Sequence, residues 1–362
     1  MHEEKIPSSK VGAKIVEWYS CILSSSYEDA TILKHEVTQM LKKMEDDDKI
    51  LAYYSLVNYR HENMLDGNNK SVSLEDTFQY VETQMDHYLK YLYYFVSGQD
   101  EFNNHKYRTA VKMFRKAERL LEYVQDDAEE AEFLGYMGYA YYRINQYLLS
   151  LSYLEQAETV FRRLNLTKKA INNKQVMGAI YVELRQFDKG NQILIEALNE
   201  STYATTTGII LRALGLSQFS QNNYPSALHY FKRALEIEEH ANSIYGMNTL
   251  AEMAHAQFKL GDKSNALIHL EKAKASAQFY NDLECKARCK YMDGLYHTNK
   301  ITLVDEALDE LLNAELYFEV CELAEELIDI FEKKGDDDSV IKYFKIAYKA
   351  KLNQNMIGDG QE

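Results

Sequence analysis

Four consecutive carboxylates at positions 45–48 are the first side chains in the sequence with a clear chemical use. Glu45, Asp46, Asp47 and Asp48 follow a helical pattern that ends in two lysines. Because an acidic surface speeds the encounter with a basic one, the cluster suits docking to a basic partner, such as the DNA-contacting face of a transcription factor. The alternative interpretation is a solvated helix end without a partner.

Other reactive side chains lack the spacing that a reaction requires. Cys285 and Cys289 are four residues apart, but no CxxC or HxxxH pattern completes a metal site, so we expect reduced packing cysteines. The phosphate-binding pattern GxxxxGK[ST] does not occur. We therefore expect no cofactor, no metal and no enzyme activity, although sequence leaves open a Ser-His-Asp triad assembled from distant residues.

Composition excludes several classes of protein. The 362 residues carry a formal charge of −15, which disfavours direct binding to nucleic acid. No apolar run approaches the ~18 residues of a membrane span, and the polar N-terminus is unlike a signal peptide, so we expect a cytoplasmic protein without membrane contact. Only two prolines and 15 glycines occur, which favours long helices.

An internal repeat in the sequence indicates which secondary-structure elements position these residues. Small, aromatic and large residues recur in one order, with a glycine or alanine first, an aromatic near the turn, and small residues on either side of a large one. The first copy is Gly98, Tyr107, Ala110, Phe114 and Ala117; later copies begin at Gly138, Gly178 and Gly215; a fifth contains Ala254, Ala266, Leu270 and Ala273; weaker ones surround Gly294 with Ala307 and Phe344 with Ala347. This order resembles the tetratricopeptide repeat, a helix–turn–helix unit.

The small residues allow the two helices of a unit, and successive units, to pack closely. The sequence therefore predicts an all-α fold, an N-terminal three-helix bundle followed by a right-handed tetratricopeptide-repeat superhelix. We expect bundle helices from Ser8 or Ser9 (as cap), at 27–44 and at 50–65. The predicted parts are the bundle at 1–67, a linker helix at 68–90, the repeats at 91–352 and a flexible tail at 353–362.

Several segments resemble the Rap family of Bacillus-type quorum-sensing regulators. They are IPSSKVGAKIVEWY at 6–19, KMEDDDKILAYYSL at 43–56, YRHENML at 59–65 and EEAEFLGYMGYAYY at 129–142. The resemblance implies that the bundle docks a partner regulator. It also implies that the repeats bind a re-imported Phr-type signalling pentapeptide, which switches partner binding off.

The resemblance also helps to decide between phosphatase activity and sequestration of a regulator. Phosphatase members of the family rely on a glutamine in a Met-Glu-acidic-acidic-Gln motif, and here Asp48 occupies that position. A glutamine can orient water, whereas an ionised aspartate only accepts hydrogen bonds and repels a phosphoryl group. A slip to Asp47 or Lys49 restores no glutamine. We therefore expect sequestration of a transcriptional regulator, as by an anti-repressor of conjugation genes on a plasmid or other mobile element; the alternatives are an aspartyl-phosphate phosphatase and a repeat scaffold without peptide control.

The repeat phase predicts which residues face the peptide. Amides suit a peptide backbone because they donate and accept, and Arg212 suits a carboxylate. By resemblance, Glu183 anchors a basic side chain, and Ala213 replaces a clamping asparagine, so the clamp moves to Gln175 or Asn248. Each position is otherwise only an exposed helix residue. The predicted peptide-binding set is Tyr139, Tyr142, Asn172, Gln175, Glu183, Arg212, Phe219, Asn248, Glu252 and His255. Self-association is possible, and the sequence does not set its stoichiometry.

Overall fold

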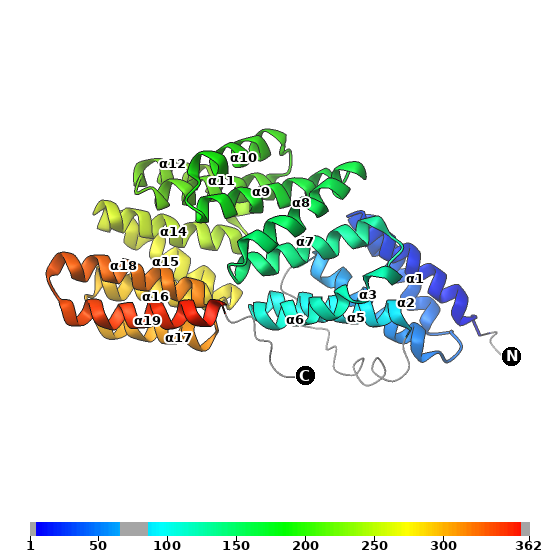
Figure 1. The fold of residues 1–362 in the computed structure, drawn as a ribbon. Helices are drawn as coiled ribbons and strands as arrows, with labels where there is room; N and C mark the ends of the chain where they lie inside the picture. Colours follow the sequence, from blue (N-terminus) through cyan, green and yellow to red (C-terminus); the bar gives the residue numbers. More distant parts are fainter. Residues whose placement is uncertain (1–4, 66–85, 356–362) are drawn as a thin grey trace. The chain divides into compact units, whose positions relative to one another are not determined.

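The computed structural model describes residues 5–65 and 86–355, and these residues form helices and no β-strand (Figure 1). Contacts divide the chain into two compact units. The first takes in residues 1–141 and 159–166, and the second takes in 142–158 and 167–362. Within the described part of the chain, no helix is both long and apolar enough to cross a bilayer.

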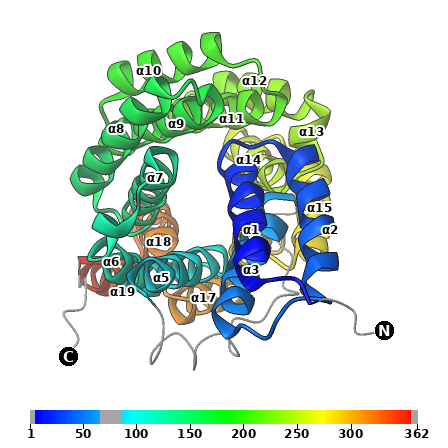
Figure 2. The same ribbon diagram turned by 90° about the vertical axis from the view of Figure 1, so that its right-hand side faces the viewer.

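The first unit opens with the predicted bundle, α1 (Ser8–Leu23), α2 (Tyr27–Leu41) and α3 (Asp48–Leu65), which lie side by side in Figure 2. The predicted apolar face of α1 is buried at Val11, Ile15, Trp18, Tyr19 and Ile22. Helix α2 ends three residues earlier than predicted. Residue Met44 instead forms a β-bridge with Ile6, which ties the segment before α3 to the start of the chain.

The predicted serine cap of α1 is wrong. Pro7 occupies the cap position, and no side chain bonds the free backbone N–H groups of this helix. The Ser8 hydroxyl bonds the Asp47 carboxylate instead, which lowers the pKa of Asp47. The serine therefore links the start of α1 to the start of α3.

The first unit continues with α5 (His87–Asn103), α6 (Tyr107–Glu118), the short helix η1 (Leu121–Tyr123) and most of α7 (Asp127–Arg143). Asp86 caps α5 by accepting from the Leu89 N–H at 2.9 Å. Of the predicted linker helix at 68–90, residues 68–85 lie outside the described residues, and residues 87–90 form the first turn of α5.

Helical hairpins make up the second unit. Paired helices include α9 with α10, α11 with α12, α14 with α15, α16 with α17 and α18 with α19. The bounds are α8 Tyr147–Arg163, α9 Thr167–Glu183, α10 Phe187–Glu200, α11 Ala204–Ser220, α12 Tyr224–Leu235, α13 Glu238–Ala241, α14 Ile244–Leu260, α15 Lys263–Tyr280, α16 Leu283–Met292, the π-helical turn η2 Asp293–His297, α17 Ile301–Asn313, α18 Tyr317–Lys334 and α19 Asp337–Asn355. Helix α8 also contributes its last turn to the first unit.

Close packing inside a hairpin depends on the repeated small residue, as predicted. A Cβ atom added at Gly215 in α11 would lie 2.4 Å from the Phe231 ring of α12. The small and large residues that follow in this copy, Ala227, Phe231 and Ala234, are fully buried. The recurring glycine is therefore needed because a larger side chain would collide with the partner helix.

The last weak copy of the repeat is placed wrongly. Phe344 is 60% exposed, and Tyr343 occupies the buried position of α19 instead. Helix α19 also extends to Asn355, so residues 353–355 of the predicted tail are helical, and residues 356–362 lie outside the described residues.

Candidate functional site

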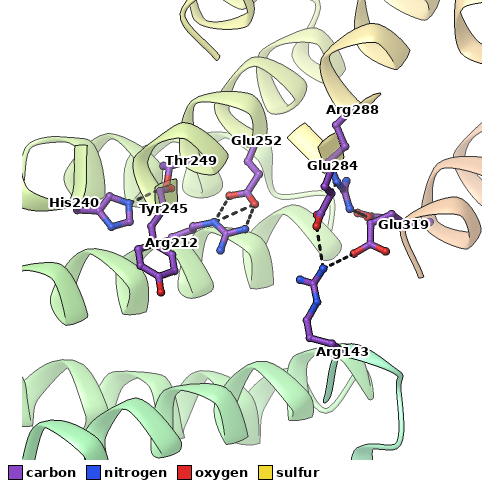
Figure 3. Close-up of polar contacts among 10 residues, drawn as sticks. Arg143, Arg212, His240, Tyr245, Thr249, Glu252, Glu284, Arg288 and Glu319 are labelled. Carbon is purple, nitrogen blue, oxygen red and sulfur yellow. Dashed lines mark hydrogen bonds and ion pairs between the residues drawn. The ribbon is translucent and has the colours of Figure 1, made fainter. Parts of the chain in front are cut away.

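Charged residues on the first helices of successive hairpins in the second unit bind one another. Arg212 of α11 donates from Nε to the Glu252 carboxylate of α14 at 2.9 and 3.1 Å, and its Nη2 donates to the same group. The two side chains keep 24% and 18% of their surface exposed. Both residues belong to the predicted peptide-binding set, and the structure brings them together as a bidentate ion pair (Figure 3).

A second charged group joins residues far apart in the sequence. Arg143, in the last turn of α7, donates to Glu284 of α16 at 2.9 Å and to Glu319 of α18 at 3.0 Å (Figure 3). Arg288, one turn after Glu284, binds Glu322 of α18 at 2.6 Å. Glu319 is buried, and burial together with the charge of Glu284 raises the pKa of Glu319 to about 7.

Glu183 differs from these carboxylates because it has no ion pair among the described residues. Its side chain reaches solvent at the end of α9, yet charged groups of α16 and α18 surround it. Partial loss of water around its carboxyl, reinforced by the charge of Glu322 and opposed by that of Arg288, raises the pKa of Glu183 to about 7. A cation that reached this position would relieve the unfavourable charge.

The predicted amides have two different environments. Gln175 of α9 and Asn248 of α14 are half-buried and have no hydrogen-bond partner within the described part of the chain, so both can donate and accept. Asn172 is partly used, because its Oδ1 accepts from the Thr206 hydroxyl at 3.1 Å. Ala213, at the position of the expected asparagine, is buried.

The predicted aromatic residues separate into three places. The Phe219 ring packs against His255 with centroids 5.1 Å apart, and His255 bonds Glu326 of α18 at 3.1 Å. Tyr142 packs against Tyr147, 6.2 Å between centroids, in the second unit. Tyr139 belongs to the first unit and packs against Tyr136, 6.0 Å between centroids.

Sequence reasoning missed two parts of this region. Tyr245 lies one turn before Asn248 on the same face of α14, and its ring lies beside Arg212 with the hydroxyl pointing away from the helix (Figure 3). Extending by one turn the face of α14 that carries Asn248 and Glu252 would have found it. Glu284 and Glu319 gave no signal, because their partner Arg143 is 141 and 176 positions away.

The four acidic residues at the start of α3 have different environments. Glu45, Asp46 and Asp48 are exposed. Asp47 is partly buried and accepts from the Ile50 N–H at 3.2 Å, so it caps α3. Three of the predicted partner-binding residues therefore point to solvent, and the fourth has a structural role.

The chain is similar to known proteins over nearly its whole length. The family model for the N-terminal part of response regulator aspartate phosphatase H matches residues 5–66. Over 99% of its length, the chain is 35% identical to the protein named type II methyltransferase M.CeqI of Rhodococcus hoagii and covers 70% of it. Over 97% of its length, it is 27% identical to response regulator aspartate phosphatase I of Bacillus subtilis (strain 168) and covers 93% of it.

Two solved structures share the fold. A Rap protein in complex with competence and sporulation factor has a TM-score of 0.90 at 24% identity, covering 97% of this chain and 100% of that one. The Rap conjugation gene regulator of plasmid pLS20, in complex with the Phr* peptide, has a TM-score of 0.75 at 23% identity, covering 99% of each chain. Both are Rap proteins, whereas the Rhodococcus relative carries the name of a methyltransferase.

Proposed function

Because the chain belongs to the Rap family of regulators, we propose that it binds a short signalling peptide on the inner helices of its second unit and thereby controls whether its bundle holds a transcriptional regulator. The observation that supports peptide binding is that some polar side chains of the second unit have a bonding partner and others do not. Arg143, Arg212 and Arg288 are each paired with glutamates, whereas Glu183, Gln175 and Asn248 are not paired within the described residues.

The side chains without a partner indicate which chemical groups the peptide should carry. The amides of Gln175 and Asn248 suit an extended backbone, and the unpaired carboxylate of Glu183 suits one basic side chain or a free amino terminus. The ligand is therefore a Phr-type pentapeptide with a positive charge. An acidic peptide would have to displace Glu252 from Arg212, which costs the bonds of that pair.

The test is a comparison of two fluorescent pentapeptide pools by anisotropy. One pool carries lysine at a fixed position, and the other carries norleucine there, which has nearly the same length but no charge. Binding of the lysine pool, tighter than that of the norleucine pool, supports the proposal. Equal binding of both pools contradicts the role of Glu183, and no binding of either contradicts peptide control.

The partner half of the proposal rests on the exposed residues Glu45, Asp46 and Asp48. A basic DNA-contacting surface complements them, and covering that surface would relieve repression of the partner's genes, as an anti-repressor does. The location would be the cytoplasm, where the partner acts.

Charge reversal tests this surface. Replacing Asp46 and Asp48 with lysine should weaken binding to the regulator by about tenfold or more, because attraction becomes repulsion. Asp47 is left intact because it caps α3. Reversal of Glu28 and Asp29, which are exposed in the first turn of α2, is the matched control. Unchanged affinity of the Asp46/Asp48 variant would contradict the proposed surface.

Phosphatase activity is the second candidate, since the family model and a relative carry that name. Asp48 is exposed at the first residue of α3, where it can meet a partner but cannot donate a hydrogen bond to water when ionised. Incubation with a phosphorylated response regulator separates the candidates. Retained phosphate at equal stoichiometry supports sequestration, and catalytic loss supports the phosphatase.

A further inference from the structure

A buried polar cluster joins the bundle to the first repeat helices inside the first unit. Tyr19 of α1, Arg60 of α3 and Glu129 of α7 are only 3%, 4% and 2% exposed. The Tyr19 hydroxyl donates to Glu129 Oε1 at 2.7 Å, and the Tyr88 hydroxyl of α5 donates to Glu129 Oε2 at 3.0 Å. Arg60 donates to the Tyr19 oxygen and to Glu132 of α7.

Glu129 is the unusual member of this cluster. Its two carboxylate oxygens accept from neutral phenols, and no cation forms an ion pair with it within residues 5–65 and 86–355. Arg60 reaches it only through Tyr19, since the guanidinium itself pairs with Glu132. A carboxylate that is buried without an ion pair favours its neutral, protonated form.

The surroundings of Glu129 reinforce this preference. Burial, opposed by the charge of Arg60, raises the pKa of Glu129 to about 7. The titratable and charged groups that face it are Tyr19 from α1, Tyr53 and Arg60 from α3, Tyr88 and Tyr91 from α5, and Glu132 from its own helix.

From this geometry we infer that docking of the bundle onto α5 and α7 takes up a proton at Glu129, so that the bundle is held more tightly in acid than above neutral pH. In the protonated form Glu129 Oε2–H donates to the Tyr88 hydroxyl oxygen, and the bond between these two groups reverses its direction. The cluster has bundle groups, Tyr19 and Arg60, on one side and repeat groups, Tyr88, Glu129 and Glu132, on the other. Undocking would return Glu129 to water, where its carboxyl ionises normally. The regulatory meaning of this proton rests on the function proposed above, but the proton uptake does not.

The direction of the effect follows from linkage. The pKa of Glu129 is higher in the docked form than in the undocked form, so protonation favours docking. This contribution is fully present when pH is below the normal pKa of a glutamate, and it is lost as pH rises through about 7. Between pH 6 and 7 the docking constant should fall about fivefold, and above pH 7.5 it should level off.

Amide hydrogen exchange of the full chain, read by mass spectrometry between pH 6 and 8, measures this change. Protection of α1 and α3, corrected for the chemical exchange rate, should fall about fivefold from pH 6 to 7, while α14 and α15 serve as internal reference. Glu129→Gln should remove the pH dependence, because an amide does not titrate. Glu130→Gln, at the exposed neighbouring position, should behave like the wild type.

A second variant keeps the test decisive if Glu129→Gln does not fold. Tyr88→Phe removes one hydrogen bond that favours the carboxylate, so it should move the levelling-off to higher pH. Protection that does not change with pH in the wild type, or that changes equally in Glu129→Gln, would overturn the inference. Neither peptide nor partner is present, so this result is independent of the proposed function.

Discussion

Arginines and glutamates of the second unit neutralise one another before any ligand binds, and this determines what each residue offers. Arg212 uses its Nε and Nη2 groups on Glu252, so a peptide carboxylate would compete with an existing partner. Glu183 has no such partner among the described residues, so a basic group would displace no existing ion pair there, although the charges of Arg288 and Arg185 act on this carboxyl. At the scale of single residues, Glu183 is therefore the better candidate of the two for anchoring a peptide.

The Arg212–Glu252 pair should contribute to stability as well. Arg212→Ala leaves Glu252 without its cation in surroundings that already raise its pKa by burial. We expect a loss of about 2 kcal/mol in the free energy of unfolding, measured by urea denaturation. Arg163→Ala removes an exposed pair with Asp127, at 63% and 59% exposure, and should cost under about 0.5 kcal/mol. Equal losses would show that the inner pair is not energetically distinct.

Peptide affinity should depend on pH through Glu183. Its pKa is about 7 in the free protein, and a bound cation would lower it. Affinity for a lysine-containing pentapeptide should therefore rise as pH increases from 6 to 7 and then level off, with release of a proton on binding. Anisotropy titrations at pH 6, 7 and 8 measure this, with the norleucine peptide as control. A lysine peptide that binds equally at all three pH values would contradict the role of Glu183.

At the scale of helices, sequence periodicity predicted the faces that are buried but not every boundary. The α1 face and the small–large order of the repeats are confirmed, because both reflect packing between neighbouring helices. The predicted cap at Ser8 or Ser9 is wrong, because Pro7 occupies the cap position and the Ser8 hydroxyl bonds Asp47 of another segment. Phe344 was misplaced because α19 has no following repeat in the described chain to bury a second face.

The candidate site was predictable only in part, for the same reason. The inner positions of α9, α11 and α14 follow from the repeat phase, and they include Glu183, Arg212 and Asn248. The glutamates that hold Arg143 lie on α16 and α18, and single-sequence reasoning has no means to relate residues so far apart. These glutamates could be identified only from the three-dimensional course of the chain.

The close approach of paired helices gives a prediction at this scale. Gly215→Ala should gain up to about 1 kcal/mol in helix propensity, but its new methyl would lie 2.4 Å from the Phe231 ring. Overpacking of this kind costs about 1–3 kcal/mol, so a net loss of stability is expected in thermal denaturation. The combined variant with Phe231→Leu should recover part of it.

A matched substitution separates the steric effect from a general effect of glycine. In Gly12→Ala, the added methyl meets only the flexible end of Ile50, at 2.9 Å. This variant should be near neutral or slightly more stable. If both alanine variants are equally stable, the packing argument fails.

At the scale of the whole molecule, the two units hold different kinds of chemistry. The first carries exposed carboxylates at the start of α3 and a buried cluster around Glu129. The second carries inner charged pairs, together with amides and one carboxylate that have no partner in the described part of the chain. The proposed function assigns partner binding to the first unit and peptide binding to the second.

Isothermal titration calorimetry with a lysine-containing pentapeptide chosen from the pool tests this account most directly. The wild type should bind one peptide per chain and release a proton, seen as a heat that varies with the ionisation enthalpy of the buffer. Glu183→Gln should weaken binding by about tenfold and abolish the proton release, whereas Glu236→Gln, at an exposed position after α12, should do neither. Binding that is indifferent to Glu183→Gln, or no binding at all, would contradict the account.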